Sequence, residues 1–440
     1  MLYNFLEINR SSGKSLTEQL YESLRNAIEV GYLKPGEHLL SIRQASTELG
    51  LSRTTVENAY QKLTLEGYAE ARPQSGYRVQ SVLPRRKTLK LEKEREPLYD
   101  FTTHGTDPME ADLDTWRKLL KGVLTDVKAV STYGDPQGEL KLRKALSSYS
   151  FRARGVVSDP STVFIGAGTG PLLQLLCPIL DRSMPVIAEA PGFPLLERIF
   201  SDYGYEISFV PSEGTYPEMD KCMLVSLPSM RPRRTAEETM KERDTLKSWL
   251  GSGNDRYILE DDYNGELRYR TRPLSSFQSL SPDRTIYIGS FSKLLLPSVR
   301  VAYMVLPEVL ASSARKRLLD QNQTAGKTEQ LALAEYIESG LLEKHLRRLR
   351  RAYQRKSQIM ESMIRKVFGK NTQYELLETS LSFVVHLGAA VDADELICKA
   401  EDRGIALRKA PGIDNGILLG FSSIRETDIE KGFEELSSCL

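Results

Sequence analysis

From about residue 98 to the C-terminus, short apolar runs alternate with longer segments in which apolar residues recur every three or four positions. Short apolar runs are typical of buried strands, and the recurring pattern is typical of helices. Regular alternation of the two predicts a mostly parallel sheet with helices on its faces, an α/β fold. The predicted strands are 162–166, 185–189, 223–227, 257–260, 285–289 and 299–306, and helical patterns include 172–180 and 243–250.

The tail of the chain has a different order of elements. From about residue 311 a long charged helical stretch precedes two apolar runs, 382–387 and 416–421. Basic residues concentrate in 345–356, for which we favour an amphipathic helix with one buried face. Contact of this helix with DNA or a partner subunit is the alternative. The tail therefore predicts a small α+β lobe at the C-terminus.

Residues 81–97 have another composition, with six basic residues, three acidic residues and prolines near both ends. Such a segment is typical of a solvated linker, and an exposed helix is the alternative for its middle. We therefore predict three parts: a domain over 1–80, a linker over 81–97 and a larger domain over 98–440. The whole is a multi-domain α/β protein.

The N-terminal part reads as helices followed by a hairpin. Ser15 and Glu18 form a capping-box pattern at the start of the first helix. Residues 42–49 and 53–66 predict two more helices, separated by a short turn at Gly50. Two strands, 68–71 and 76–79, follow. This is the layout of a winged helix-turn-helix that reads DNA.

The residue types at the start of the third helix suit DNA contact. Arg53, Thr54 and Thr55 are the kinds of residue that bind phosphates and base edges from such a position. The stretch PGEHLLSIRQASTELGLSRTTVENAYQKLTLEGYAEARPQSGYRV resembles the GntR-type winged helix, with Leu40 standing where Pro is usual. A protein-binding helical module is the alternative. The resemblance implies DNA contact by Arg43, Arg53, Thr54, Thr55 and Gly76.

The charge balance restricts how DNA is bound. The chain holds 60 Lys and Arg against 59 Asp and Glu, which excludes a purely electrostatic nucleic-acid binder as a description of the whole. Residues 1–80 also sum to zero, with nine basic and nine acidic side chains. Binding is therefore expected to depend on a few placed arginines, the basic linker and two heads in a dimer.

Other features limit the remaining classes. The four cysteines are far apart, and no His lies near them at metal-ligand spacing, so we expect neither a metal site nor a disulfide framework. No apolar run is long enough to cross a membrane, and the first 13 residues lack the core of a signal peptide. We expect a cytoplasmic protein, associated with the nucleoid as a DNA binder.

The sharpest chemistry lies after the predicted strand 285–289. Lys293 follows in a loop, where a lysine can form a Schiff base with an aldehyde cofactor, although a solvated surface lysine is the common alternative. Two serines, Ser290 and Ser292, and the nearby Arg300 can hold a phosphate dianion.

Three further segments supply the rest of such a site. Asp261 ends a predicted buried strand, where a carboxylate needs a partner such as a pyridinium nitrogen, and Tyr263 can bond a ring hydroxyl. In a glycine-rich turn, the N–H groups of Gly168 and Thr169 open a helix and can bind phosphate. Phe193 follows another strand and can stack on an aromatic ring.

These pieces, in this order, resemble a fold-type I aminotransferase that uses pyridoxal 5'-phosphate. Joined to a GntR-type head, they resemble the MocR subfamily of bacterial transcriptional regulators. The resemblance implies an internal aldimine at Lys293, a homodimer that is head-to-tail and domain-swapped, and Tyr133 reaching into the partner's site. The other implied cofactor residues are Asp261 and Tyr263 at the ring, Phe193 stacked on it, and Gly168, Thr169, Ser290, Ser292 and Arg300 at the phosphate.

The chain departs from that pattern where an amino acid's carboxylate is usually gripped. Leu418 stands at the position of the usual Arg, and Met230 or Arg231 at that of a polar residue near the ring. The segment TSLSFVV also lacks a usual His. Loss of a bidentate pair costs on the order of 2–5 kcal/mol of binding. The candidates to replace it are Arg231, Arg233, Arg234 and Arg408.

The favoured hypothesis is a DNA-binding transcriptional regulator that senses pyridoxal phosphate, an amine or an amino-acid-derived ligand through Lys293. It would be no enzyme, although partial transamination stays open. An active aminotransferase with an accessory DNA-binding head is the alternative. A third hypothesis is a regulator that senses pyridoxal phosphate alone.

Overall fold

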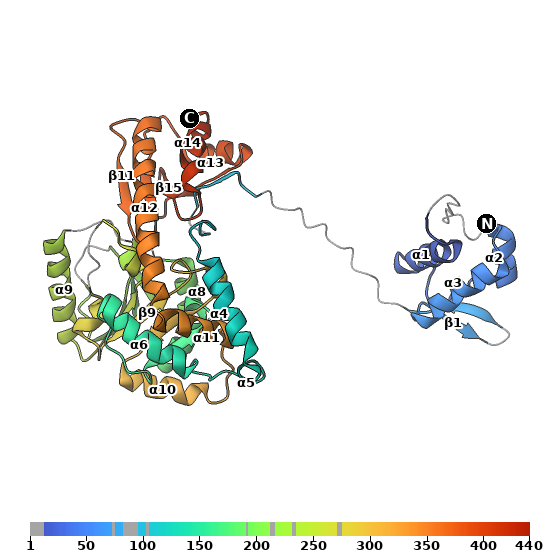
Figure 1. Ribbon diagram of the computed structural model, residues 1–440, viewed down its shortest axis with the longest axis horizontal. Coiled ribbons are helices and arrows are strands. Elements are labelled where there is room, and N and C mark those ends of the chain that lie inside the picture. Colours follow the sequence, from blue (N-terminus) through green and yellow to red (C-terminus); the bar gives the residue numbers. More distant parts are fainter. Residues whose placement is uncertain are drawn as a thin grey trace. The chain divides into compact units, whose positions relative to one another are not determined.

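The computed structural model describes residues 13–72, 75–81, 96–102, 105–190, 192–211, 216–230, 235–270 and 275–440 (Figure 1). The chain forms two compact units, Met1–Glu94 and Arg95–Leu440, which we call the head and the body. Most of the predicted linker, residues 82–95, lies outside the described residues.

The head contains three helices and a two-stranded wing. Its core is built from one face of each helix and includes Leu24, Ala45, Val56 and Tyr60. Strands β1 and β2 pair antiparallel, with Ala69 opposite Val79. The elements are α1 (Leu16–Glu29), α2 (Ile42–Leu49), α3 (Arg53–Leu65), β1 (Ala69–Arg72) and β2 (Gly76–Val79).

One predicted detail of the head is wrong in part. The Ser15 hydroxyl accepts from the backbone N–H of Glu18 at 3.2 Å, as a cap should. The Glu18 carboxylate, however, bonds the ammonium group of Lys62 on α3 instead of returning to the cap. An ion pair to a neighbouring helix has therefore replaced half of the expected capping box.

The body is built on a seven-stranded sheet with the order β4-β10-β9-β8-β7-β5-β6. Only β10 is antiparallel to its neighbours, so the sheet is mostly parallel, as predicted. The strands are β4 (Val163–Gly166), β5 (Val186–Glu189), β6 (Ile207–Val210), β7 (Lys221–Ser226), β8 (Asp255–Asp261), β9 (Thr285–Ser290) and β10 (Ala302–Val305).

Two strand predictions differ from the structure. The predicted strand 299–306 begins only at Ala302, because Pro297–Val299 form a 3₁₀ turn and Arg300 takes a left-handed φ of 49°. Strand β6 was not predicted. It lies at the sheet edge and is only half-buried, so its residues lack a continuous apolar run.

Helices cover both faces of this sheet. Alternate strand residues point to opposite sides, so Ile165 joins a core with α6 and α11 while Phe164 joins one with α7, α8 and α10. The helices around this sheet are α4 (Leu113–Thr125), α5 (Val127–Val130), α6 (Leu140–Arg154), α7 (Thr169–Leu176), α8 (Pro194–Asp202), α9 (Ala236–Gly251), α10 (Glu308–Leu318) and α11 (Lys327–Glu338).

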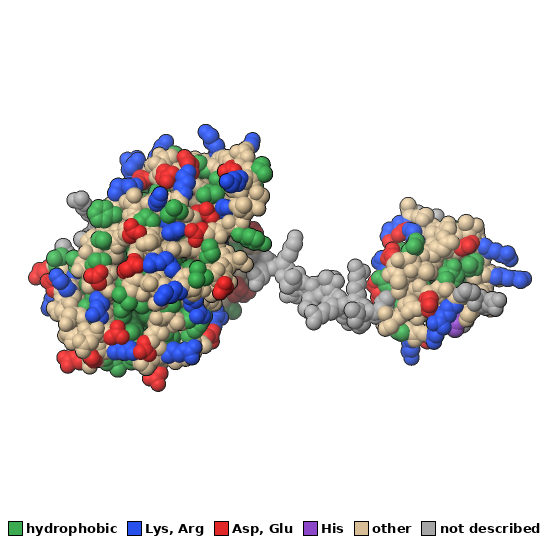
Figure 2. Space-filling view, turned by 90° about the horizontal axis from the view of Figure 1, so that it is seen from below, with side chains coloured by type: hydrophobic (Ala, Val, Ile, Leu, Met, Phe, Trp, Pro, Cys, Tyr) green, Lys and Arg blue, Asp and Glu red, His purple; other side chains and the backbone are tan. Residues whose placement is uncertain are grey.

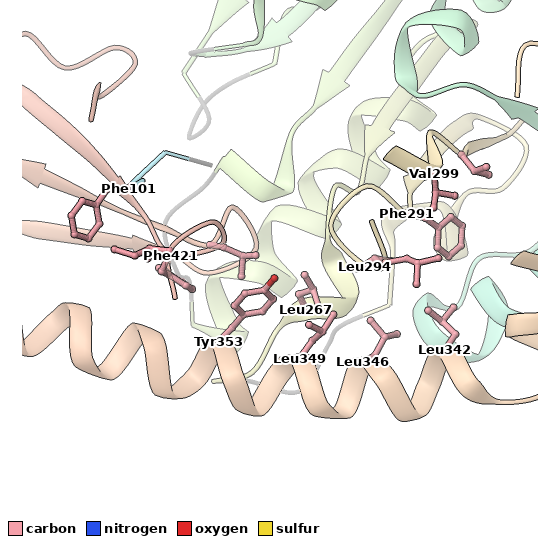
Figure 3. Close-up of a cluster of buried hydrophobic side chains, with 14 of the residues drawn as sticks. Phe101, Leu267, Phe291, Leu294, Val299, Leu342, Leu346, Leu349, Tyr353 and Phe421 are labelled. Atoms are coloured by element: carbon pink, nitrogen blue, oxygen red, sulfur yellow. The ribbon is translucent and has the colours of Figure 1, made fainter. Parts of the chain in front are cut away.

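The 27-residue helix α12 (Leu341–Val367) joins the sheet to a smaller C-terminal lobe. Figure 3 shows Leu346 and Leu349 on the same side of this helix as Leu267 and Leu294, and Tyr353 beside Phe421 further along. The predicted basic helix is therefore amphipathic, with a buried apolar face.

The lobe is α+β, as predicted, and its four-stranded sheet has the order β11-β12-β15-β14. A separate two-stranded ladder pairs β13 with β3, the first strand of the body. The elements are β3 (Tyr99–Asp100), β11 (Tyr374–Leu377), β12 (Ser382–His386), α13 (Ala393–Asp402), β13 (Ile405–Ala406), β14 (Arg408–Lys409), β15 (Gly416–Gly420) and α14 (Ile429–Ser437).

Candidate cofactor site and DNA-binding head

The sheet places most of the predicted cofactor residues along one of its edges. The carboxyl ends of β4, β5, β8 and β9 meet there, and the antiparallel β10 starts there. Register fixes the neighbours: Ser290 lies opposite Ala302, and Ala302 lies opposite Gly166. Carboxyl ends of parallel strands are where ligands of α/β proteins bind.

Lys293 lies in the turn that follows β9 and is only 4% exposed, which rules out the solvated surface lysine. Its ammonium group donates to the carbonyl oxygen of Gly105 and, at 3.2 Å, to the hydroxyl of Ser422. Burial lowers the pKa of Lys293 to about 8, so about a tenth of the amine is neutral near pH 7, far more than for an ordinary lysine. A neutral, desolvated amine is a nucleophile.

Asp261 ends β8 and is half-buried. Burial, followed by repulsion from Asp262, raises the pKa of Asp261 to about 7. Within the described residues, no hydrogen bond or ion pair involves this carboxylate. A desolvated carboxylate without a partner suits a cation or an N–H donor from a ligand.

Asp262, the next residue, differs from Asp261 because its carboxylate has partners within the fold. The Asp262 carboxylate is held by Arg154 at 2.6 and 3.0 Å and by the hydroxyl of Tyr287 at 2.9 Å. Both partners of the ion pair are buried, with side-chain exposures of 5% and 3%. This pair was not predicted, because Arg154 lies 108 residues away in the sequence. It anchors the turn that carries Asp261.

Tyr263 follows in the same turn and is half-buried. Burial raises the pKa of its hydroxyl to about 12, so the group stays protonated and can donate a hydrogen bond. Beside it, Asn264 has a left-handed φ of 61° and a buried side-chain oxygen that has no hydrogen-bond partner among the described residues. That orphaned acceptor is a second polar group available to a ligand.

The glycine-rich turn and Arg300 form a cradle at the start of α7. Gly168 has a φ of 101°, and a Cβ built there would lie 2.5 Å from a guanidinium nitrogen of Arg300. That nitrogen donates to the carbonyl of Ala167 at 3.3 Å. The hydroxyls of Ser290 and Ser292 lie 3.2 Å apart. Hydroxyls, a guanidinium and the helix start at Thr169 are a donor set for a phosphate dianion.

Phe193 and Tyr133 lie on segments other than those that carry these groups. Phe193 precedes α8, is half-buried and packs against the core on that face of the sheet. Tyr133 is 92% exposed beside a cavity of about 260 Å³ lined by residues 132–134 and 322–327. Both assignments stay predictions.

The structure places one of the four candidates to replace the carboxylate-binding Arg. Arg408 on β14 lies directly opposite Leu418 on β15. Directly opposite residues share a face of the sheet. Arg408 is exposed, and Leu418 belongs to a small apolar cluster away from the main core. The side chain of Met230 and all of Arg231, Arg233 and Arg234 lie outside the described residues.

Two residues that touch Lys293 were not predicted at all. Gly105 and Ser422 carry no recognisable motif and lie 317 residues apart, yet the Ser422 hydroxyl donates to the Gly105 carbonyl at 3.0 Å. Only the folded chain brings them to the lysine.

In the head, Arg43, Arg53 and Thr54 are exposed, and Thr55 is half-buried with its hydroxyl 2.7 Å from that of Ser52. Gly76 has a φ of 81° at the wing, where a Cβ would meet open space. The structure therefore leaves the predicted contact residues available to DNA.

Two other arginines of the head are already engaged. Arg78 donates to the carbonyl of Gly36 at 2.8 Å, and Arg72 pairs with Glu70 at 3.0 Å. On the body, Figure 2 shows acidic and basic side chains interspersed over the visible face. On that face neither sign of charge dominates the body, and DNA contact by the exposed residues of the head stays a prediction.

The part of the chain that the structure describes holds no group of three or more His, Cys, Asp or Glu side chains suited to a metal ion. In the same residues, no helix is both long and apolar enough to cross a membrane.

Two family models match the chain. Residues 16–79 match bacterial regulatory proteins of the gntR family, and residues 104–221 match aminotransferase class I and II. In fold, the body is similar to a kynurenine aminotransferase of Pyrococcus horikoshii. The TM-score is 0.67 at 20% identity, over 80% of this chain and 92% of that one.

Three curated relatives match the chain over nearly its whole length. The HTH-type transcriptional regulator YhdI of Bacillus subtilis is 31% identical over 98% of this chain and 97% of its own. The pyridoxine biosynthesis transcriptional regulator PdxR of Corynebacterium glutamicum is 29% identical over 99% and 98%. The probable rhizopine catabolism regulatory protein MocR of Rhizobium meliloti is 26% identical over 99% and 96%.

The similarity to these relatives extends over both units of this chain, and their names describe regulators of transcription. The winged head, the aminotransferase-like body and the full-length similarity agree. The chain therefore belongs to the MocR subfamily of GntR-type transcriptional regulators.

Proposed function

We propose that this regulator binds pyridoxal 5'-phosphate in the body and senses the cofactor, or an amine or amino-acid-derived ligand that reacts with it, at Lys293. The observation that carries the proposal is that two groups follow strands at the same end of the sheet. One is the buried amine of Lys293, and the other is the desolvated carboxylate of Asp261, which has no partner among the described residues. When bound, pyridoxal phosphate supplies an aldehyde that bonds an amine covalently.

The chain's own residues divide the work of holding this group. Asp261 would hold a proton on the pyridine nitrogen, because its carboxylate is otherwise unpaired and costly to leave charged. Tyr263 would donate to the ring oxygen, and Phe193 would stack on the ring. The phosphate would lie among Gly168, Thr169, Ser290, Ser292 and Arg300.

Names of related proteins support the choice of cofactor. The name of PdxR ties that regulator to pyridoxine biosynthesis. An α-aminoadipate aminotransferase of Thermus thermophilus, similar to this chain in fold with a TM-score of 0.65 and 23% identity, was solved with N-(5'-phosphopyridoxyl)-L-leucine. Both facts concern those proteins, and we extend them here as a proposal.

We propose a regulator without significant transaminase turnover. Leu418 cannot form the bidentate carboxylate pair, so an α-amino acid would lose on the order of 2–5 kcal/mol of binding. Arg408, opposite Leu418, offers a guanidinium on the same face and would be the replacement in a ligand that reaches it. An active aminotransferase is the second candidate, favoured by the cofactor residues that remain.

For partners we propose operator DNA, bound by Arg43, Arg53, Thr54, Thr55 and Gly76, and a second copy of the chain. Tyr133 is 92% exposed beside the cavity lined by residues 132–134 and 322–327, and a second copy whose site it entered would cover this side chain. Two heads would also offset the neutral charge of each.

Two measurements on the full-length protein test the proposal. Pyridoxal phosphate should give a visible absorption band that Lys293→Ala abolishes, and absence of any band contradicts the cofactor assignment. Footprinting of the protein's own promoter region, with and without the cofactor and a panel of amines, should show a pattern that depends on these ligands. Rapid amino-acid turnover without DNA binding would favour the aminotransferase.

A further inference from the structure

The first described residues of the body are built into the C-terminal lobe. Strand β3 pairs in parallel with β13, and the N–H of Leu98 donates to the carbonyl of Gly404 at 2.8 Å. Phe101 then donates to Ala406 at 3.0 Å and accepts from Gly420 at 2.6 Å. Figure 3 shows the Phe101 and Phe421 side chains at the lobe end of this core. The segment that continues from the linker is thus part of this lobe.

The next residues are fastened to the loop after β15. Gly105 donates its N–H to the Ser423 hydroxyl at 3.0 Å, and Asp107 donates its N–H to the Ser422 carbonyl at 2.7 Å. The Asp107 carboxylate accepts from Lys356 of α12 at 2.8 Å, and these side chains are 3% and 0% exposed. Lys356 also donates to the carbonyl of Ile424 at 2.8 Å. A buried ion pair offsets the cost of desolvating its two charges only in a favourable geometry, so Asp107 and Lys356 fix the position of this segment.

Lys293 belongs to the same cluster. The Gly105 carbonyl accepts from both Lys293 and Ser422, and Lys293 also donates to Ser422 at 3.2 Å. We call Gly105, Asp107, Lys356 and Ser422 the latch. It joins the lysine of the candidate site to the chain segment that leads back to the linker.

We propose that the hold of the latch on residues 98–102 and 105–107 depends on the covalent state of Lys293. These residues would pass the change on to the linker of the DNA-binding head. This inference rests on the proposed function. When the neutral Lys293 amine condenses with an aldehyde, a carbon–nitrogen double bond replaces its two N–H bonds and one water leaves. The neutral product has no N–H to donate to Gly105 or Ser422. If its nitrogen is protonated, the single N–H points to the cofactor ring and not to these two residues.

The physical consequence is a weaker hold on residues 98–102 and 105–107. Among the described residues, the Gly105 carbonyl keeps the Ser422 hydroxyl as its donor, and the Ser422 hydroxyl loses the lysine as a donor. Loss of a charge-assisted hydrogen bond shifts a local opening equilibrium by about tenfold. The free amine of Lys293 therefore holds this segment against the C-terminal lobe. A ligand that releases Lys293 as an amine restores its hydrogen bonds to Gly105 and Ser422.

Hydrogen–deuterium exchange of the full-length protein tests this, with the visible band recorded on the same samples. Adding pyridoxal phosphate should raise exchange over residues 98–107 by about tenfold, while the amides that start α7 become slower. In Ser422→Ala, exchange should already be fast without the cofactor and change less than about twofold on its addition. The matched control is Ser437→Ala, whose exposed hydroxyl bonds the carbonyl of Glu434 at 2.7 Å and which should behave as wild type.

DNA affinity supplies the second readout. The cofactor-dependent change in operator affinity should shrink in Ser422→Ala and persist in Ser437→Ala. A normal band with unchanged exchange over 98–107 overturns the latch alone. Absence of the band overturns the cofactor proposal, and the latch with it.

Discussion

The head and the body place their charges in opposite ways. In the head, Arg43 and Arg53 are exposed on α2 and α3, two helices that are close together in the sequence. In the body, Arg154 and Lys356 are buried and pair with Asp262 and Asp107, which lie 108 and 249 residues away. Exposed charges contact a partner and cost little, whereas buried charges need a partner within the fold. Exposed charge in the head would serve the DNA recognition proposed above, and the two buried ion pairs fix the geometry of the body.

The largest effect should come from Lys293, whose buried ammonium group donates to a carbonyl and a hydroxyl rather than to a carboxylate. Lys293→Ala should abolish the visible band and any ligand response, because no other amine among the described residues occupies that turn. Absorption spectra of the purified protein check this. Lys327→Ala, which removes a half-buried lysine bonded to Thr132, should keep the band. A full band in Lys293→Ala would break the comparison.

Severing the buried ion pair should come next. Arg154→Met leaves the Asp262 carboxylate uncompensated and should lower the free energy of unfolding of the body by about 3–5 kcal/mol. Urea denaturation measures this. The control, Arg117→Met, removes an exposed partner of Asp114 and should change stability by less than about 1 kcal/mol. Equal effects would show that burial does not distinguish the two charges.

Gly168→Ala should weaken cofactor binding by about tenfold. Its φ of 101° disfavours a side chain, and the new Cβ would force Arg300 to move. Titration with pyridoxal phosphate, followed by the visible band, gives the Kd. Gly122→Ala in α4, where a Cβ meets nothing within 4 Å, should leave the Kd unchanged.

In the head, Arg53→Ala should weaken operator binding by about 1–3 kcal/mol and reduce its salt dependence. Electrophoretic mobility shifts at several salt concentrations measure both. Lys14→Ala removes an exposed lysine paired with Glu22 at the start of α1, and operator binding should stay within about twofold of wild type. A comparable loss in both variants would mean that the head binds by charge alone.

The smallest effect is a pH dependence. Burial depresses the pKa of Lys293 to about 8, so the neutral amine fraction grows as pH rises towards that value. The rate of cofactor attachment should therefore increase with pH and level off above about 8. Stopped-flow absorbance across a pH series checks this. A rate that keeps rising to the ordinary lysine pKa would show that the amine is not desolvated.

The comparison also explains which parts of the site were predictable. Lys293, Asp261, Tyr263 and the Gly168 turn follow strands, and the carboxyl ends of parallel strands meet at one edge whatever the details of packing. Their proximity was therefore predictable from strand order. The strand break at Arg300 was not, because no local pattern in the sequence indicated its left-handed φ of 49°.

The sequence by itself determined the winged head, the α/β body, the small C-terminal lobe and the residue types of the cofactor site, because each is encoded by local periodicity or by a short motif. Only the tertiary structure decided which aspartate is paired and which is free, that Arg408 lies opposite Leu418, and that Gly105 and Ser422 hold Lys293. These contacts join residues far apart in the chain. A buried polar group is satisfied by whatever the fold brings to it, and no local pattern records that partner.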